Sequence, residues 1–341
     1  MLKRWLGRRF VAATCALALL AGAGAAPIAR AAPEHATMAI PAPVVLFLTV
    51  YAAQDYFWPK EGLDINLINI PGVGSMNAVI SGSAEFSLSS GGSITRAAAH
   101  GQKLIAIAAL NNETGQFITL RKDIAEQRHF DPRAPFAERG KALKGLTIAT
   151  AGLGSVADAV IRIALRRAGL DSEKDATVAP MQPTDIMAAF ARKSIDAFSL
   201  GPPFAQQAAH DGTGVILLNG VEGDPPGYTP LSTALLVTRP QLCADRRALC
   251  EKLGHSILEA ASYVHAHRDD AIASLKKRFP TLADAVLAAA ADAVIKMTGT
   301  PPVTSAAGIA NGDRMNADAG FLKPGDQLKS YDDLFTNEYL K

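Results

Sequence analysis

Between residues 63 and 110, apolar segments alternate with short turns that are rich in glycine and serine. Some of these segments have the length and composition of strands, and others have those of short helices. They predict strands at 64–70, 84–89 and 104–110, and helices at 76–81 and 94–100. Regular alternation of strands and helices predicts a parallel sheet that is covered by helices.

The alternation continues through most of the chain. It predicts further strands at 36–40, 116–121, 146–150, 176–180, 196–200, 215–218 and 232–238. It predicts further helices at 44–56, 156–168, 184–192, 204–210, 245–267, 270–279 and 282–295. Turn-forming residues instead predict a turn at 57–62, loops at 128–139 and 296–311, and a tail from Asp313 that packs back on the first lobe.

The pattern Gly-x-Gly-Ser occurs twice, at residues 72–75 and again at 152–155. Each copy follows a predicted strand and precedes a predicted helix. Turns of this kind at the carboxyl ends of strands offer backbone N–H groups to small ligands. One such turn in each half of the chain predicts two lobes that face each other.

The first 31 residues have the order of a secretory signal peptide. A basic front precedes an apolar core at 10–23 and a small-x-small cleavage site at 29–31. The pair Arg8-Arg9 leaves the twin-arginine route open, but Phe10 directly after it favours ordinary export. We therefore expect a periplasmic protein, and no later apolar run is long enough to span a bilayer.

The positive charge of the chain resides in this leader. The whole chain has 34 Lys and Arg, 32 Asp and Glu and a formal net charge of +2, whereas the leader has five basic residues and no acidic one. The exported chain therefore has a formal net charge of −3. This balance gives no reason to expect nucleic acid or an anionic membrane surface as a partner.

Two cysteines, Cys243 and Cys250, remain after export, and an oxidising compartment favours a disulfide between them. Seven residues of continuous helix would separate them by roughly 10 Å, which exceeds the usual Cα limit of about 7 Å. We therefore expect Cys243 in a turn before the helix that carries Cys250. Two buried or unpaired thiols remain the alternative.

Signatures of catalysis and of cofactors are weak. The chain has no HExxH, CxxC or GxSxG motif and no cluster of carboxylates, and His265 and His267 lie on different faces of one predicted helix. Gly152-x-Gly154-x-x-Ala157 matches a permissive dinucleotide fingerprint, but the matching turn has Asn77 in the third position. We expect no metal and no cofactor. Ser155 is instead expected to cap a helix and to present N–H groups to a ligand, although a plain cap is the alternative.

Six short segments, in order along the chain, resemble motifs of the substrate-binding proteins of nitrate/sulfonate/taurine-type ABC importers, which belong to the thiamine-pyrimidine-synthase-like superfamily. The resemblance lies in 56–65 ("GFF-x-KEGLDV"), 81–86 ("SGEADF"), 143–149 ("LKGKTVAV"), 167–171 ("KAGLD"), 195–204 ("VDA…PF") and 331–335 ("YDDLF/V"). It implies an α/β type II periplasmic-binding-protein fold. Lobe 1 would then comprise residues 32–112 plus 230–341, and lobe 2 would comprise residues 113–229.

The resemblance also implies a monomeric receptor that closes its lobes on a small molecule and delivers it to a membrane permease. The cleft turns would supply the binding residues Pro41, Pro43, Val44, Gly74, Ser75, Ser90, Gly91, Ser93, Asn111, Asn112, Thr150, Gly154, Ser155, Gly201, Pro202 and Phe204.

The sequence narrows the ligand only to a class. Relatives that bind taurine or sulfonates often have Trp-Asp-Pro-Tyr where this chain has Gly201-Pro202-Pro203-Phe204, so a partner for a ligand ammonium is missing. No Arg or Lys falls in the predicted cleft loops. We therefore expect a sulfonate, a carboxylate or a neutral heterocycle.

Two enzymes and a sensor remain as alternatives. A pyrimidine synthase of this fold depends on a cysteine-rich segment, which is missing here. A desulfinase of this fold uses an early Cys and an Arg-Gly-Gly turn, where this chain has Ser90-Gly91-Gly92. We therefore expect no enzymatic activity. A sensor-type binding protein is the third hypothesis.

Overall fold

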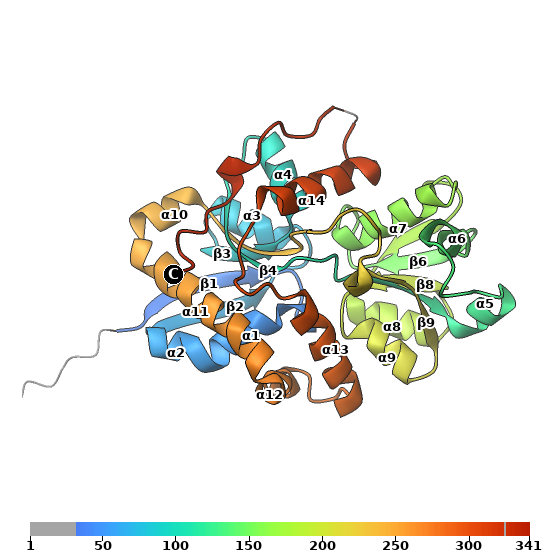
Figure 1. Ribbon diagram of the computed structural model, residues 1–341, viewed down its shortest axis with the longest axis horizontal. Coiled ribbons are helices and arrows are strands. Elements are labelled where there is room, and N and C mark those ends of the chain that lie inside the picture. Colours follow the sequence, from blue (N-terminus) through green and yellow to red (C-terminus); the bar gives the residue numbers. More distant parts are fainter. Residues whose placement is uncertain (1–31, 324) are drawn as a thin grey trace, which may run out of the picture. The chain divides into compact units, whose positions relative to one another are not determined.

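The computed structural model describes residues 32–323 and 325–341, so the predicted signal peptide lies outside the described residues. Two separate five-stranded sheets organise this part of the chain (Figure 1). Each sheet is covered by helices on both faces. The predicted α/β class with two lobes is therefore confirmed. We keep the predicted lobe boundaries as a proposal.

The first sheet has the strand order β2-β1-β3-β10-β4. Its strands are β1 Glu34–Ile40, β2 Leu63–Asn69, β3 Phe86–Ser89, β4 Ile105–Asn111 and β10 Ala234–Thr238. The second sheet has the order β7-β6-β8-β5-β9. Its strands are β5 Phe117–Arg121, β6 Thr147–Thr150, β7 Thr177–Pro180, β8 Ala197–Leu200 and β9 Gly214–Asn219.

Both sheets are mixed, so the prediction of a parallel sheet is confirmed only in part: β1 is parallel to β2 and β3, and β6 is parallel to β7 and β8. Strand β10 is antiparallel to β3 and β4, and strand β5 is antiparallel to β8 and β9. These two strands are the first that the chain forms after it passes from one sheet to the other. The chain enters each sheet at the edge where the parallel strands end, because β5 begins beside the end of β9 and β10 begins beside the end of β4. Each entering strand therefore runs in the opposite direction to its neighbours.

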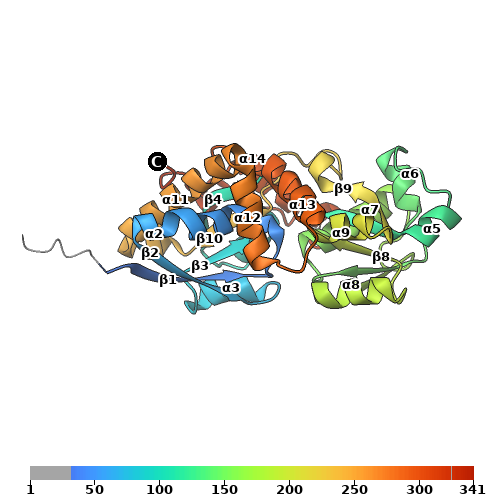
Figure 2. The same cartoon turned by 90° about the horizontal axis from the view of Figure 1, so that it is seen from below.

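Helices on the two faces of the first sheet bury two distinct cores. Figure 2 shows α3 on one face and α2 and α11 on the other. The helices of this part are α1 Leu48–Ala52, α2 Trp58–Glu61, α3 Gly74–Ser81, α4 Gly91–Ala99, α10 Pro240–Asp245, α11 Arg247–Ala266, α12 Arg268–Arg278, α13 Asp284–Met297 and α14 Ala306–Asp318. A π-helical segment, Ala53–Phe57, joins α1 to α2, and short 3-10 turns lie at Val45–Phe47 and Asp332–Leu334.

The second sheet is enclosed in the same way. Helix α7 packs on one face and α8 on the other. The helices here are α5 Lys122–Gln127, α6 Phe136–Lys141, α7 Val156–Arg167, α8 Pro183–Ala191 and α9 Phe204–His210, with a 3-10 turn at Gly220–Glu222. Because helix α6 occupies part of residues 128–139, the prediction of a loop there was partly wrong.

Two further predictions of irregular structure were wrong. Residues 57–62 continue the helix as far as Glu61, because Pro59 lies in the first turn of α2, where its missing N–H costs no hydrogen bond. The chain turns only at Gly62, whose φ of 66° suits glycine. Helix α14 also occupies part of the predicted loop 296–311.

Helix α14 makes contacts in both parts of the molecule. It packs closely on α4, where a Cβ atom on Gly92 would lie 2.9 Å from the carbonyl oxygen of Gly312. Its other end places Met315 and Ala319 in the core around α7. Helix α14 therefore links the surroundings of α4 to those of α7.

Cys243 and Cys250 form a disulfide with a Cα–Cα distance of 5.6 Å. The prediction that Cys243 lies in a turn was wrong, because this residue belongs to the short helix α10. The chain bends at Arg246, where φ and ψ leave the helical region, and the bend brings the two cysteines together. In the described part of the chain, no helix has both the length and the apolar character of a membrane span.

Candidate functional site

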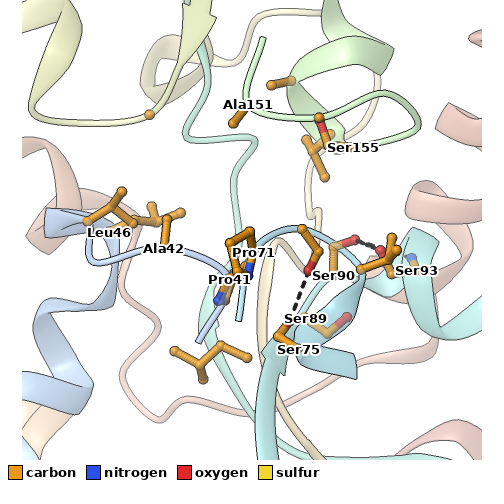
Figure 3. A pocket seen from close by; sticks show the side chains of 18 of the residues that line it. Pro41, Ala42, Leu46, Pro71, Ser75, Ser89, Ser90, Ser93, Ala151 and Ser155 are labelled. Atoms are coloured by element: carbon orange, nitrogen blue, oxygen red, sulfur yellow. Dashed lines mark hydrogen bonds between the residues drawn. The ribbon is translucent and has the colours of Figure 1, made fainter. Parts of the chain in front are cut away.

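A cavity of about 220 Å³ is lined by loops that follow strands of both sheets. Figure 3 shows Pro71 and Ser90 on one side and Ala151 and Ser155 on the other. The loops come from the carboxyl ends of β1, β2 and β3 in the first sheet, and of β6, β7 and β8 in the second. This is the location where ligands bind in open α/β sheets.

Several of the residues predicted for binding line this cavity. They are Pro41, Val44, Ser75, Ser90, Ser93, Gly154, Ser155, Gly201 and Phe204. Ser90 caps α4 by accepting a hydrogen bond from the Ser93 backbone N–H (3.2 Å), and the two hydroxyls lie 3.0 Å apart. Their role in binding stays a prediction.

The other predicted residues do not line the cavity. They are Pro43, Gly74, Gly91, Asn111, Asn112, Thr150 and Pro202. Gly91 faces α14, where a Cβ atom on it would lie 3.1 Å from the Cα of Ile309. The amide of Asn111 is buried and donates to the carbonyl of Leu46 (3.2 Å), so it supports the loop after β1. Turn and strand-end positions alone do not reveal which way a residue faces.

Arg96, a residue of α4, lines the cavity but was not among the predicted binding residues. The expectation that the cleft contains no Arg or Lys was therefore wrong. Arg96 is the charged residue of the lining. Among the described residues that line the cavity, there is no Asp, Glu, His or Lys. Arg96 lies six residues after Ser90, the N-cap of α4. Its place at the cavity depends on the direction of this helix, which the sequence does not give.

The guanidinium of Arg96 is held by two neutral oxygens. Its Nη2 donates to the carbonyl of Gly154 (2.8 Å), and its Nη1 donates to the side-chain oxygen of Asn316 (2.8 Å). Burial lowers the pKa of Arg96, and the carboxylates of Asp158 and Asp313 oppose that shift. Within the described residues, no carboxylate lies within 4.0 Å of the guanidinium. A half-buried cation with neutral partners is suited to an anionic ligand.

The two Gly-x-Gly-Ser turns both contribute to the cavity but differ in structure. In the second turn, Ser155 caps α7 by accepting from the backbone N–H of Asp158 (3.3 Å), as predicted. In the first turn, α3 already begins at Gly74, and the hydroxyl of Ser75 donates to the carbonyl of Gly72 (3.1 Å). Ser75 is therefore not a cap.

The middle residue of each turn adds an apolar side chain beside these polar groups. Val73 is 55% exposed and Leu153 is 56% exposed, and both line the cavity. Leu46, Phe47 and Phe204 extend the apolar lining. The cavity thus offers a polar corner at Arg96 and an apolar wall, which together suit a small molecule with an acid group and an apolar portion.

Comparisons with known proteins identify the fold. The model of the NMT1-like family matches residues 31–278. A protein from Bordetella bronchiseptica RB50 has a TM-score of 0.77 and 20% identity, over 90% of this chain and 95% of that chain. The alkanesulfonate-binding protein SsuA from Xanthomonas axonopodis pv. citri, bound to MOPS, has a TM-score of 0.69 and 18% identity, over 90% and 100%. The periplasmic nitrate-binding protein NrtA from Synechocystis PCC 6803 has a TM-score of 0.59 and 19% identity, over 72% and 67%.

No curated protein sequence matches the chain. The structural similarities confirm the predicted periplasmic-binding-protein fold. At these identities they establish the fold and not the ligand.

Proposed function

Because the chain belongs to the NMT1-like family, we propose that it is the solute-binding receptor of an ABC importer. The observation that carries the proposal is the cavity of about 220 Å³, which is lined by both Gly-x-Gly-Ser turns and by loops that follow strands of both sheets. Structural neighbours with this fold include proteins that bind an alkanesulfonate and nitrate. A receptor of this kind captures a solute outside the membrane and delivers it to a permease.

The proposed ligand is a small organic acid with an apolar portion, either a sulfonate or a carboxylate. Its acid group would accept hydrogen bonds at the corner formed by Arg96, Ser90 and Ser155, all of which line the cavity. Charge-assisted hydrogen bonds are stronger than neutral ones, so Arg96 favours an acid over a neutral heterocycle. A zwitterion such as taurine fits less well, because no carboxylate of the described lining faces its ammonium.

Ligand binding is proposed to draw the two lobes together. The lobes are 32–112 plus 230–341 and 113–229, as the sequence predicts. The hydrogen bond from Arg96 to Gly154 already joins α4 to the second turn (2.8 Å). An acid bound at this corner would add contacts to both lobes and so favour the closed state. We propose that the permease recognises this state, and that the receptor is an exported, periplasmic monomer.

No chemical step is part of this proposal. The cavity lining in the described residues includes no His, Cys, Asp or Glu, the side chains that most often transfer protons or attack substrates. Arg96 can bind and orient an acid but is a poor general base, because it stays protonated. The lining therefore supports capture rather than conversion of the ligand.

A thermal-shift screen tests the proposal. The probes are alkanesulfonates, aliphatic and aromatic carboxylates, and pyrimidines, each added to the purified protein. We expect one or more of the acids to raise the melting temperature, because a ligand that binds only the native state stabilises it. Calorimetry should then give one site per chain, and mass spectrometry should recover the acid unchanged. Failure of every acid to bind, or conversion of a bound acid into a product, would contradict the proposal.

A further inference from the structure

A cluster of three side chains lies away from the cavity, on the surface between α2 and α11. It comprises Glu61, His255 and Glu259, and one ligand atom from each lies within 4.8 Å of the others. None of the three lines the cavity. We propose that this cluster is a binding site for a divalent transition-metal ion, Zn²⁺ in the first instance, that joins α2 to α11.

The backbone fixes the relative positions of the three groups. His255 and Glu259 are four residues apart on α11, so their side chains project from the same face of the helix. Glu61 ends α2, and the almost fully buried Trp58 holds that short helix against the core. The Nδ1 atom of His255 lies 2.9 Å from Oε1 of Glu61. Two ligands from one helix and a third from a packed neighbour therefore converge without a change in the fold.

The charges of the cluster are not balanced by a basic residue. Glu61 pairs with His255 alone, and no Lys or Arg of the described chain lies within 4.0 Å of either Glu61 or Glu259. The nearby Lys252 instead pairs with Glu34 (3.1 Å). Protonation of His255 would balance one carboxylate, whereas a divalent cation would balance both.

The ligand types indicate the class of metal. Zinc binds imidazole nitrogen and carboxylate oxygen at about 2.0–2.2 Å, so its ligand atoms lie roughly 3.4 Å apart in a tetrahedral site. Small rotations of the half-exposed side chains would bring the three atoms to that spacing. Water would complete the fourth position. Calcium and magnesium prefer sets of oxygen ligands and fit an imidazole poorly.

The sequence contains only part of this signal. The spacing His255-x-x-x-Glu259 falls within a predicted helix, but Glu61 lies 194 residues before His255. The expectation that the chain binds no metal rested on the lack of a local motif. A site assembled from α2 and α11 has no such motif.

The test is a titration of Zn²⁺ into the purified chain without a histidine tag. Calorimetry is expected to show one saturable site, and the melting temperature should rise with zinc concentration. Co²⁺ should give absorption bands in the visible region, whereas Ca²⁺ should leave the melting temperature unchanged. The variant Glu259→Gln changes an exposed residue and should weaken zinc binding at least tenfold, as should His255→Ala.

The chain offers a matched control in His35, whose Nδ1 lies 2.9 Å from a carboxylate oxygen of Asp64. Among the described residues, no third side chain that could bind a metal lies close to both His35 and Asp64. His35→Ala is expected to bind zinc as the native chain does. The proposal is overturned if the native chain shows no saturable site, if both cluster variants bind zinc normally, or if His35→Ala loses zinc to the same extent.

Discussion

The two Gly-x-Gly-Ser turns share a sequence pattern, yet the chain holds them in different ways. The second turn is tied to a buried charge, because the N–H of Gly154 donates to Oδ2 of Asp158 (2.7 Å), and Arg162 donates to Oδ1 of the same carboxylate (2.8 Å). The first turn has only local contacts, such as the bond from the N–H of Gly74 to the carbonyl of Pro71 (3.2 Å). Similar sequence therefore gives one wall of the cavity that is held by a buried ion pair and one that is held by local hydrogen bonds.

The positive φ angles also fall on different glycines. In the first turn Gly72 has a φ of 58°, whereas in the second turn Gly154 has a φ of 72°. The left-handed conformation thus lies at the first glycine of one turn and at the second glycine of the other. The shared pattern permits both arrangements because either glycine can adopt this conformation at little cost.

The largest expected effect concerns the buried carboxylate that supports the second turn. Asp158→Ala should lower the free energy of unfolding by about 3 kcal/mol, because the N–H of Gly154 loses its acceptor and Arg162 keeps only its exposed partner Glu173. Denaturant unfolding measures this change. Ser75→Ala in the first turn is the comparison and should cost only about 0.5–1.5 kcal/mol, because it removes one local hydrogen bond to the carbonyl of Gly72. Equal effects of the two variants would show that the turns are held alike.

Substitution of three of these glycines tests the difference in φ. Gly154→Ala and Gly72→Ala should each destabilise the protein by about 1–2 kcal/mol, because alanine is strained in the left-handed conformation. Gly152→Ala should be close to neutral, since a Cβ atom there meets no atom within 4 Å and the residue has no positive φ. A large loss of stability in Gly152→Ala would contradict the assignment of the strained position.

The helix cap gives a smaller difference. Ser155→Ala should cost about 1 kcal/mol of stability, because α7 loses the hydroxyl that accepts from the N–H of Asp158. Thermal unfolding of Ser155→Ala beside Ser155→Asp, which restores a capping oxygen, measures the effect. If both variants lose the same stability, the capping role of Ser155 is wrong.

The smallest expected effect is on ligand affinity at the apolar tips. Leu153→Ser and Val73→Ser should each weaken binding of the acid selected by the thermal-shift screen by about threefold to fivefold, because each half-exposed side chain would be covered by the ligand. Calorimetry measures the change. Val303→Ser is a matched control, since Val303 is also exposed (40%) but does not line the cavity. If Val303→Ser lost the same affinity, Val73 and Leu153 would not be ligand-binding residues.

Strand positions were largely predictable from the sequence, whereas helix α14 was not. Gly308 and Gly312 lower the intrinsic helix propensity of α14, so residues 296–311 resemble a loop. The same glycines allow α14 to approach Gly91 and Gly92 closely, and this packing outweighs the low propensity. Contacts between distant segments therefore determine the element, and no local pattern reveals them.

The candidate site was predictable in outline only. Serines in turns after strands pointed to the cavity, because the edge of a sheet fixes where such turns lie. Arg96 was missed because it belongs to a helix, where direction and not sequence position decides what a side chain reaches. Asn111 was misassigned because a polar residue at a strand end can equally support a neighbouring loop, as its bond to Leu46 does.

The central claim is that Arg96 binds the acid group of a captured solute, and one calorimetric titration tests it most directly. The acid selected by the thermal-shift screen is titrated into the native chain, into Arg96→Gln and into Arg133→Gln, which removes an exposed positive charge that does not line the cavity. We predict that Arg96→Gln weakens binding at least about tenfold, in line with the loss of a hydrogen bond to a charged group, while Arg133→Gln binds normally. Equal affinity of the native chain and Arg96→Gln would contradict the account.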